Sequence, residues 1–160
     1  MPTQVTSAFR RFGETLRAFT IAQRTVAIIG LAVLALGIAS TGMTVHRKWL
    51  DAVADNIANV NTATSTDGTA FQARYVIAQE GQGTSGVYVA GTASGDAEGR
   101  LTYQPDNALA DADGYVRLPD VDLAAEMGQL ILAQRGYQAN AAVVDRAKSS
   151  YEAALQIGRS

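Results

Sequence analysis

The stretch VDLAAEMGQLILAQRGYQANAAVVDRAKSSYEAALQI, residues 121–157, carries the strongest structural signal in this sequence. One set of its residues recurs without a slip at alternating steps of four and three: Leu123, Met127, Leu130, Gln134, Tyr137, Ala141, Val144, Lys148, Tyr151 and Leu155. A sustained repeat of 3.5 residues predicts a helix whose seam packs against another helix in a supercoil. A helix of this length would extend about 55 Å at 1.5 Å per residue.

A second apolar stripe lies beside this seam and comprises Ile131, Val143, Ala147, Ala154 and Ile157. A helix with two apolar edges needs more than one neighbouring helix to cover them. The only long soluble partner that the sequence offers is a predicted helix over residues 40–60, which would be about 30 Å long. Because this partner is too short, we expect other copies of the chain to cover the remaining apolar surface.

The predicted helix 40–60 ends in a cluster of asparagines. Its apolar stripe follows helical spacing through Met43, His46, Leu50, Val53, Ile57 and Val60. Asn56, Asn59 and Asn61 lie where this stripe runs out. Asparagine is a poor residue for a helix interior, but it tolerates the left-handed conformation in which many helices end. We therefore expect the helix to end near Val60, with its asparagine amides exposed for hydrogen bonds to neighbouring molecules.

Residues 63–119 change from helical to strand-like patterns. The short alternating stretches are RYVIAQ (74–79), GVYVAG (86–91), GRLTYQP (99–105) and GYVRLP (114–119), with turn residues between them. This pattern predicts a few antiparallel strands or hairpins. Pro119 then interrupts the chain, and Asp120 or Asp122 could cap the final helix. The predicted fold class is α+β, with long N- and C-terminal helices forming a coiled-coil-like pair around a small antiparallel β-rich middle region.

Residues 1–37 differ in kind from the rest of the chain. They have a formal charge of +3, mostly from arginine, against −5 for the remainder. The run VAIIGLAVLALGIA, residues 26–39, is uncharged, and a membrane span could extend over residues 26–45. Its large apolar candidates are Val26, Ile28, Ile29, Leu31, Val33, Leu34 and Leu36. Length and the arginine flank favour an N-terminal membrane helix, with a cleavable signal and a buried hydrophobic helix as the alternatives.

The composition argues against several kinds of functional site. The net charge of −2 and the lack of a basic patch with aromatic residues argue against nucleic-acid binding. The sequence has no cysteine and a single histidine, His46, so we predict no metal site and no cofactor. The segment DADG, residues 111–114, lacks the ligand spacing of a calcium loop, and we interpret it as a turn. No group of residues has the pattern of a catalytic site, so an enzyme is not expected.

Two long motifs resemble those of a known family. IASTGMTVHRKWLDAVADNIANVNT (38–62) is similar to the N-terminal signature of the bacterial flagellar axial proteins, the rod and hook family. ADADGYVRLPDVDLAAEMGQLILAQRGYQANAAVVDRAKSSYEAALQIGR (110–159) is similar to their C-terminal signature, and its opening is closest to the proximal rod members. The residues that carry the N-terminal motif are Trp49, Leu50, Asn56, Ile57, Asn59 and Asn61. The short middle region also resembles the proximal rod members.

The resemblance implies a fold and a function. Members of this family pack their terminal helices together and against other subunits to build a hollow tube. The chain would then be a structural subunit of the flagellar basal-body rod in the periplasm, linking the MS ring to the distal rod and hook and transmitting torque. Its implied partners are other copies of itself, other rod proteins, the MS ring and the flagellar export apparatus. The seam of residues 121–157 would be its assembly surface.

The first 37 residues resemble a different flagellar protein. FRRFGETLRAFTIAQRTVAIIGLAVLALG (9–37) is similar to the N-terminal cytoplasmic stretch and first membrane helix of the MS-ring protein. The chain therefore resembles a fusion, organised as residues 1–37, 38–62, 63–119 and 120–160, and residues 26–45 could anchor it at the inner membrane. The alternative function, from a different class, is a membrane-anchored adaptor whose small β region binds one partner.

Overall fold

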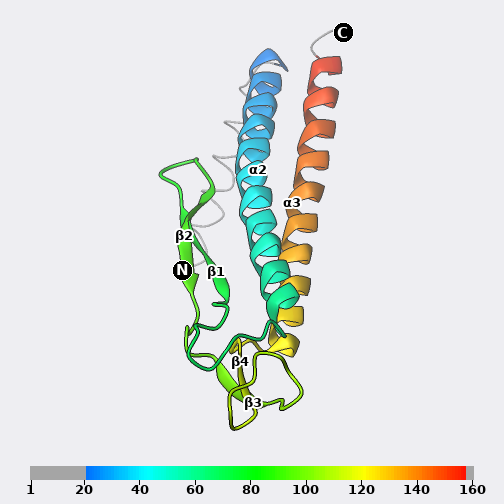
Figure 1. Ribbon diagram of the computed structural model, residues 1–160. Helices are drawn as coiled ribbons and strands as arrows, with labels where there is room; N and C mark the ends of the chain where they lie inside the picture. Colours follow the sequence, from blue (N-terminus) through cyan, green and yellow to red (C-terminus); the bar gives the residue numbers. More distant parts are fainter. Residues whose placement is uncertain (1–20, 158–160) are drawn as a thin grey trace, which may run out of the picture. The chain divides into compact units, whose positions relative to one another are not determined.

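The computed structural model describes residues 21–157 and has an α+β architecture (Figure 1). Within these residues, the elements follow one another as α2 (Ile21–Asn59), β1 (Arg74–Glu80), β2 (Val87–Ser94), β3 (Arg100–Tyr103), β4 (Tyr115–Leu118) and α3 (Leu123–Ile157). This order, with two long helices and small antiparallel sheets, confirms the α+β class predicted from the sequence. The basic leader within residues 1–20 lies outside the described residues, as do residues 158–160.

Helix α2 unites two segments that the sequence analysis treated as separate helices. It runs without interruption over 39 residues and includes both the apolar run and the predicted helix 40–60. No proline and no charged residue occurs between Arg24 and His46, so nothing in this stretch favours a helix end. Helix α3 has 35 residues. The expectation that the chain offers α3 no partner of comparable length is therefore wrong.

The described residues form two units, each of which we consider by itself. One unit contains residues 38–142, which are the second part of α2, both hairpins and the first part of α3. The other contains the apolar first part of α2, up to Gly37, and α3 from Val143 onward. Each unit therefore contains one segment from each helix.

In the unit of residues 38–142, the two helices approach each other closely at glycines. A Cβ atom on Gly42 would lie 2.5 Å from Oδ1 of Asn140, and one on Gly136 would overlap the imidazole ring of His46. The order of these contacts along the sequence makes the two helices antiparallel. Because the separation of packed helices depends on the side chains at the contact, the glycines let the backbones come close.

The middle region folds into two antiparallel hairpins. β1 pairs with β2 in a register that places Arg74 opposite Ser94. β3 pairs with β4 so that Tyr103 lies opposite Tyr115, and these two rings meet edge to face with centroids 5.3 Å apart. Each strand overlaps one of the four short stretches identified in the sequence, so the prediction of antiparallel hairpins is confirmed.

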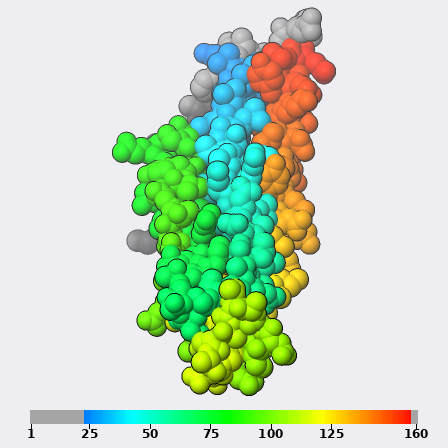
Figure 2. Space-filling model, viewed as in Figure 1, coloured from blue at the N-terminus to red at the C-terminus, as the bar shows by residue number. Residues whose placement is uncertain are grey.

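The β1–β2 hairpin packs along α2 within the same unit, and Figure 2 shows its surface in green beside the cyan surface of α2. Val76 and Val87 of the hairpin line a cavity of about 320 Å³ together with Val45 and Trp49 of α2. The Val87 N–H donates a hydrogen bond of 3.1 Å to Oγ1 of Thr41. In this unit, α2 therefore has two packing faces, one for α3 and one for the hairpin.

Arg117 on β4 holds together segments that are distant in the sequence. Its Nη2 donates a hydrogen bond of 2.6 Å to the carbonyl oxygen of Thr66, and its Nη1 donates to the carbonyl oxygen of Glu98. Its backbone N–H and carbonyl pair with those of Thr64. The preceding residue, Val116, is completely buried. Arg117 thus fixes the loop that leaves α2 against the second hairpin.

The other unit has a core of small residues. Ala32 of α2 is buried, as are Ala147 and Ala154 of α3. Most of the larger apolar residues of α2 in this unit are exposed instead: Val26, Ile28, Leu31, Val33 and Leu34. Hydrophobic stabilisation scales with the apolar area removed from water, at about 25 cal/mol per Å². Because alanine side chains bury little area, this unit leaves much of its apolar surface uncovered.

Candidate assembly site

The inward face of α3 repeats every seven residues. Its buried members are Glu126, Ala133, Ala147 and Ala154, and between them lie the half-buried Leu130, Tyr137, Asn140, Val144 and Tyr151. Successive members are separated by steps of four and three, which is the spacing of a coiled-coil seam. The periodicity seen in the sequence is therefore also present in the burial of α3.

One half of this repeat is displaced by one residue from the predicted seam. The predicted seam and the inward face of α3 share four residues: Leu130, Tyr137, Val144 and Tyr151. The prediction added Met127, Gln134, Ala141, Lys148 and Leu155. Ala141 is half-buried, as is Asn140, whereas the other four are exposed and the residue before each of them, at positions 126, 133, 147 and 154, is buried. A prediction that assigns the larger apolar side chains to the inward face favours Met127 and Leu155 over the residues before them. The helices instead meet through small residues such as Ala133, which permit close approach.

An exposed apolar stripe lies at the start of α3. Leu123, Met127 and Ile131 are 44%, 53% and 55% exposed, and we call them the exposed α3 stripe. In the same unit Leu132 is also exposed, and farther along the helix Val143, Leu155 and Ile157 are exposed. Contiguous exposed apolar side chains often mark surfaces that bind other proteins. The exposed α3 stripe is therefore the candidate assembly surface.

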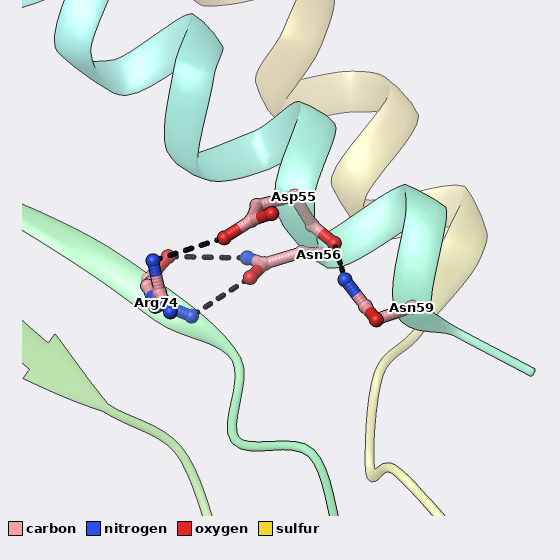
Figure 3. A network of polar contacts seen from close by, with 4 residues as sticks. All are labelled: Asp55, Asn56, Asn59 and Arg74. Atoms are coloured by element: carbon pink, nitrogen blue, oxygen red, sulfur yellow. Dashed lines mark hydrogen bonds and ion pairs between the residues drawn. The ribbon is translucent and has the colours of Figure 1, made fainter. Parts of the chain in front are cut away.

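Asn56 forms a well-defined polar site at the end of α2 (Figure 3). Its side chain is completely buried. Nδ2 donates a hydrogen bond of 3.1 Å to the carbonyl oxygen of Arg74, and Oδ1 accepts one of 2.8 Å from the Arg74 N–H. The guanidinium of Arg74 reaches back to α2, where its Nη1 lies 3.0 Å from Oδ2 of Asp55. The amide of Asn56 pairs with β1 as a neighbouring strand would, and it fixes the start of β1 against α2.

The other two asparagines have different environments. Asn59 is half-buried, and its Nδ2 donates a hydrogen bond of 2.8 Å to the carbonyl oxygen of Asp55, one turn earlier. Asn61 is exposed. The expectation of an exposed amide is therefore wrong for Asn56, because the β1 backbone covers it.

Helix α2 ends close to the predicted position. Its last residue is Asn59, one residue before Val60. Among the described residues, only glycines have a positive φ. The expected left-handed asparagine is therefore absent from this part of the chain, and the helix ends in a hydrogen-bonded turn from the Thr62 N–H to the Asn59 carbonyl oxygen, 3.0 Å long.

The remaining residues of the N-terminal motif lie on the packed faces of α2. Trp49, Leu50 and Ile57 are half-buried, and Trp49 lines the cavity beneath the β1–β2 hairpin. His46 stacks on Trp49, with ring centroids 5.9 Å apart, and packs against Gly136. Its Nδ1 is buried without a hydrogen-bond partner in residues 21–157. His46 thus acts as a packing residue between the helices.

The candidates for a membrane span lie on the first part of α2. Val26, Ile28, Leu31, Val33 and Leu34 are exposed, whereas Ile29 and Leu36 are half-buried. Helix α2 contains a stretch that is long and apolar enough to cross a bilayer, with a mean hydropathy of 2.2 and 17% of its residues buried. Signal sequences and core helices satisfy the same criteria of length and composition.

Two aspartates in the loops have a lowered pKa. The N–H of Tyr115 donates a hydrogen bond of 2.9 Å to Oδ1 of Asp111, which lowers the pKa of that carboxyl group. A side-chain hydrogen bond from Ser65 lowers the pKa of Asp67. Asp111 also accepts a hydrogen bond of 3.0 Å from the Asp113 N–H. These bonds organise residues 111–114 as a turn, as the sequence analysis predicted.

Sequence reasoning did not identify Asp55, Arg74 or Arg117. Asn56 and Arg74 are 18 residues apart, and Arg117 bonds to Thr66 across 51 residues, so no local pattern connects them. The one available signal was a polar residue, Asn56, on a helix face that is otherwise packed.

Comparison with known proteins identifies the family to which the chain belongs. A family profile described as "Flagellar basal body rod FlgEFG protein C-terminal" matches residues 112–157. The "Flagellar basal-body rod protein FlgC" of Salmonella typhimurium is 39% identical over 126 residues, which cover 76% of this chain and 94% of that protein. The chain belongs to the FlgC family of flagellar basal-body rod proteins. FlgC proteins of Yersinia enterocolitica and Borreliella burgdorferi are 41% and 33% identical, over the same shares of both chains.

Membership of the FlgC family confirms the function predicted from the two motifs. The chain is a structural subunit of the flagellar basal-body rod and not an enzyme. The matched segment 112–157 contains β4 and all of α3. The helix that carries the exposed α3 stripe therefore lies within the segment that the family profile matches.

Proposed function

We propose that the chain belongs to the proximal part of the rod, where it polymerises with other copies and with other rod proteins and links the MS ring to the distal rod and hook. The observation that carries this proposal is the exposed α3 stripe. Glu126 and Ala133, on the inward face of the same segment, are already buried within the chain. The exposed side chains of Leu123, Met127 and Ile131 are then available to a neighbouring subunit.

This division of α3 suits a tube built from packed helices. A subunit in a tube must satisfy its own fold and still offer apolar surface to its neighbours. Burial of apolar area provides about 25 cal/mol per Å², so three large side chains can contribute substantially to each contact. The subunit can thus fold through one face of α3 and assemble through another.

Replacing Met127 and Ile131 together by aspartate should abolish rod assembly while the isolated subunit remains folded. In the interface each carboxylate would be buried without a partner, which is strongly unfavourable. In the isolated subunit both positions are exposed, so the cost there should be small. The measurement is complementation of the source bacterium with its own gene deleted, scored by swimming and by electron microscopy of isolated basal bodies.

The matched control is Glu98→Lys, which changes the charge of an exposed loop residue and should leave swimming unchanged. Failure of the wild-type gene to restore rods would contradict the proposed function. Normal swimming of the double aspartate variant would contradict the role of the exposed α3 stripe.

For the N-terminal segment, we propose an MS-ring-like helix, fused to the rod subunit, that attaches it to the inner membrane. Its apolar run, its arginine flank and the exposure of Val26 and Leu31 support this assignment. Insertion would require this segment to leave α3. Otherwise the charged residues Asp145, Arg146 and Lys148 would enter the hydrocarbon, at about 3 kcal/mol each near its centre. Such an anchor would direct the chain to membrane insertion instead of the flagellar export apparatus.

After carbonate extraction, the full chain should remain in the membrane pellet, and deletion of residues 1–37 should release it. Carbonate removes proteins that are held only by surface contacts, whereas a spanning apolar helix is retained. Leu31→Arg places a charge in the middle of the span and should also increase release. Quantitative recovery of the full chain in the soluble fraction would show that the segment is not a membrane anchor. The adaptor function would instead be favoured if rods assembled normally without this gene.

A further inference from the structure

A second site lies where α3 begins, within the unit of residues 38–142. It is a pocket of about 450 Å³. Its wall includes Trp49 of α2, Arg74 and Tyr75 of β1, and Asp120, Asp122 and Glu126 at the start of α3. The pocket therefore combines aromatic rings with several carboxylates.

Glu126 is the unusual member of this set. Its side chain is only 5% exposed, and its Oε2 has no hydrogen-bond partner among the described residues. An ionised carboxylate buried without a partner is costly, and buried charges in proteins are normally paired. Residues 21–157 of the same chain therefore leave Oε2 of Glu126 open to a donor from outside.

The one basic residue in the pocket wall is already engaged. The guanidinium of Arg74 lies 3.0 Å from Asp55, which is outside the pocket. Asp122 caps α3 by accepting a hydrogen bond of 2.8 Å from the Ala124 N–H, and it forms no ion pair with a basic side chain of the described residues. The pocket wall therefore holds three carboxylates and a single guanidinium, and that guanidinium is paired with Asp55. This excess of negative charge favours an additional cation.

We propose that this pocket receives an arginine side chain from a neighbouring copy of the chain. A guanidinium can donate two parallel hydrogen bonds to a carboxylate and can stack on an aromatic ring such as Trp49 or Tyr75. A metal ion fits less well, because no three acidic or histidine residues in the described chain are grouped closely enough to hold one. The inference rests on the proposed polymerisation, which brings copies together.

The chain can also supply the donor. The arginines that are exposed and form no ion pair within the described residues are Arg47, Arg100, Arg135 and Arg146. An arginine inserted beside Glu126 would neutralise a buried charge only in the assembled rod. Pairing would thus favour assembly over the isolated subunit and orient each copy on the next.

The first test is a titration of the full chain with N-acetyl-arginine amide, using N-acetyl-citrulline amide as a neutral ligand of similar shape. The NMR signal of the Trp49 indole N–H reports on the pocket, because the chain has a single tryptophan. We expect a saturable shift with the arginine ligand alone, and an affinity about tenfold lower in Glu126→Gln. Equal shifts with both ligands, or an unchanged affinity in Glu126→Gln, would overturn the proposal.

The second test measures assembly in the gene-deleted strain with Glu126→Gln and with Glu98→Gln as the matched control. Glu126→Gln should reduce the yield of rods without lowering the stability of the isolated subunit, because it removes an unpaired buried charge. Glu98→Gln should assemble as the wild type does. If wild-type rods form and Glu126→Gln assembles equally well, the pocket proposal fails while the proposed function stands. If the wild-type gene gives no rods, the proposed function fails, and the titration alone decides the pocket.

Discussion

Replacing Asn56 by alanine should lower the free energy of unfolding of the isolated subunit by about 2–4 kcal/mol. Alanine would leave the N–H and the carbonyl oxygen of Arg74 without the partners that Asn56 now provides at 2.8 and 3.1 Å. Because Asn56 is completely buried, water does not readily replace these bonds. Urea unfolding of the full chain, followed by circular dichroism, measures the change.

Two further variants test whether the loss of stability is specific to the hydrogen bonds of Asn56. Asn59→Ala should cost less than about 1 kcal/mol, since Asn59 donates only to its own helix and alanine is the better helix former. Asn56→Asp keeps an acceptor for the Arg74 N–H but places an oxygen against the Arg74 carbonyl oxygen, so we expect it to be destabilising as well. Equal stabilities of Asn56→Ala and Asn59→Ala would contradict the role assigned to Asn56.

Ala133→Glu should lower the free energy of unfolding by at least about 3 kcal/mol, because it places a charge without a partner on the inward face of α3. Ala133 is completely buried. A longer side chain there would also force the two helices apart. Circular dichroism during urea unfolding gives the loss of stability, and size-exclusion chromatography shows whether the subunit becomes expanded.

Gln134, the residue after Ala133, supplies a matched control that tests which of the two positions faces inward. Gln134→Glu introduces the same side chain one position later, where the structure places it in solvent, so its effect should be within about 0.5 kcal/mol. A large loss from Gln134→Glu and a small one from Ala133→Glu would instead support the seam through Met127, Gln134 and Leu155.

Substitutions on the inward face of α3 and on the exposed α3 stripe test different properties of the chain. Ala133 belongs to the fold of the single chain, whereas Met127 and Ile131 belong to the candidate assembly surface. Loss of motility in Ala133→Glu should therefore be accompanied by loss of the folded subunit. Loss of motility in the Met127 and Ile131 double variant should occur with the subunit intact.

Local signals were sufficient for much of the fold. The hairpins followed from alternating residues separated by glycine-rich turns, and the end of α2 followed from the position where the apolar stripe runs out, near Val60. Asp122 caps α3 as one of the two predicted candidates, through hydrogen bonds to the N–H groups of Ala124 and Ala125. Each of these features depends on residues within a few positions of one another, and a short window of sequence contains the cause.

Other features depend on residues that only folding brings together. Neither the pairing of Asn56 with Arg74 nor the bonds from Arg117 to Thr66 and Glu98 has a local signature. The prediction for Asn56 failed for this reason, because it assigned to neighbouring molecules a hydrogen bond that Asn56 makes to β1 within the chain.

The sequence by itself determined the family, the α+β class and the seven-residue period of α3, since motifs and periodicity are properties of a single segment. The tertiary structure decided which residues of that period face inward. How closely two helices approach depends on both surfaces, and here Gly42 and Gly136 allow a contact that side-chain size alone does not reveal. The small residues of α3 thus turn toward α2, and Leu123, Met127 and Ile131 remain exposed because the inward face has no room for them.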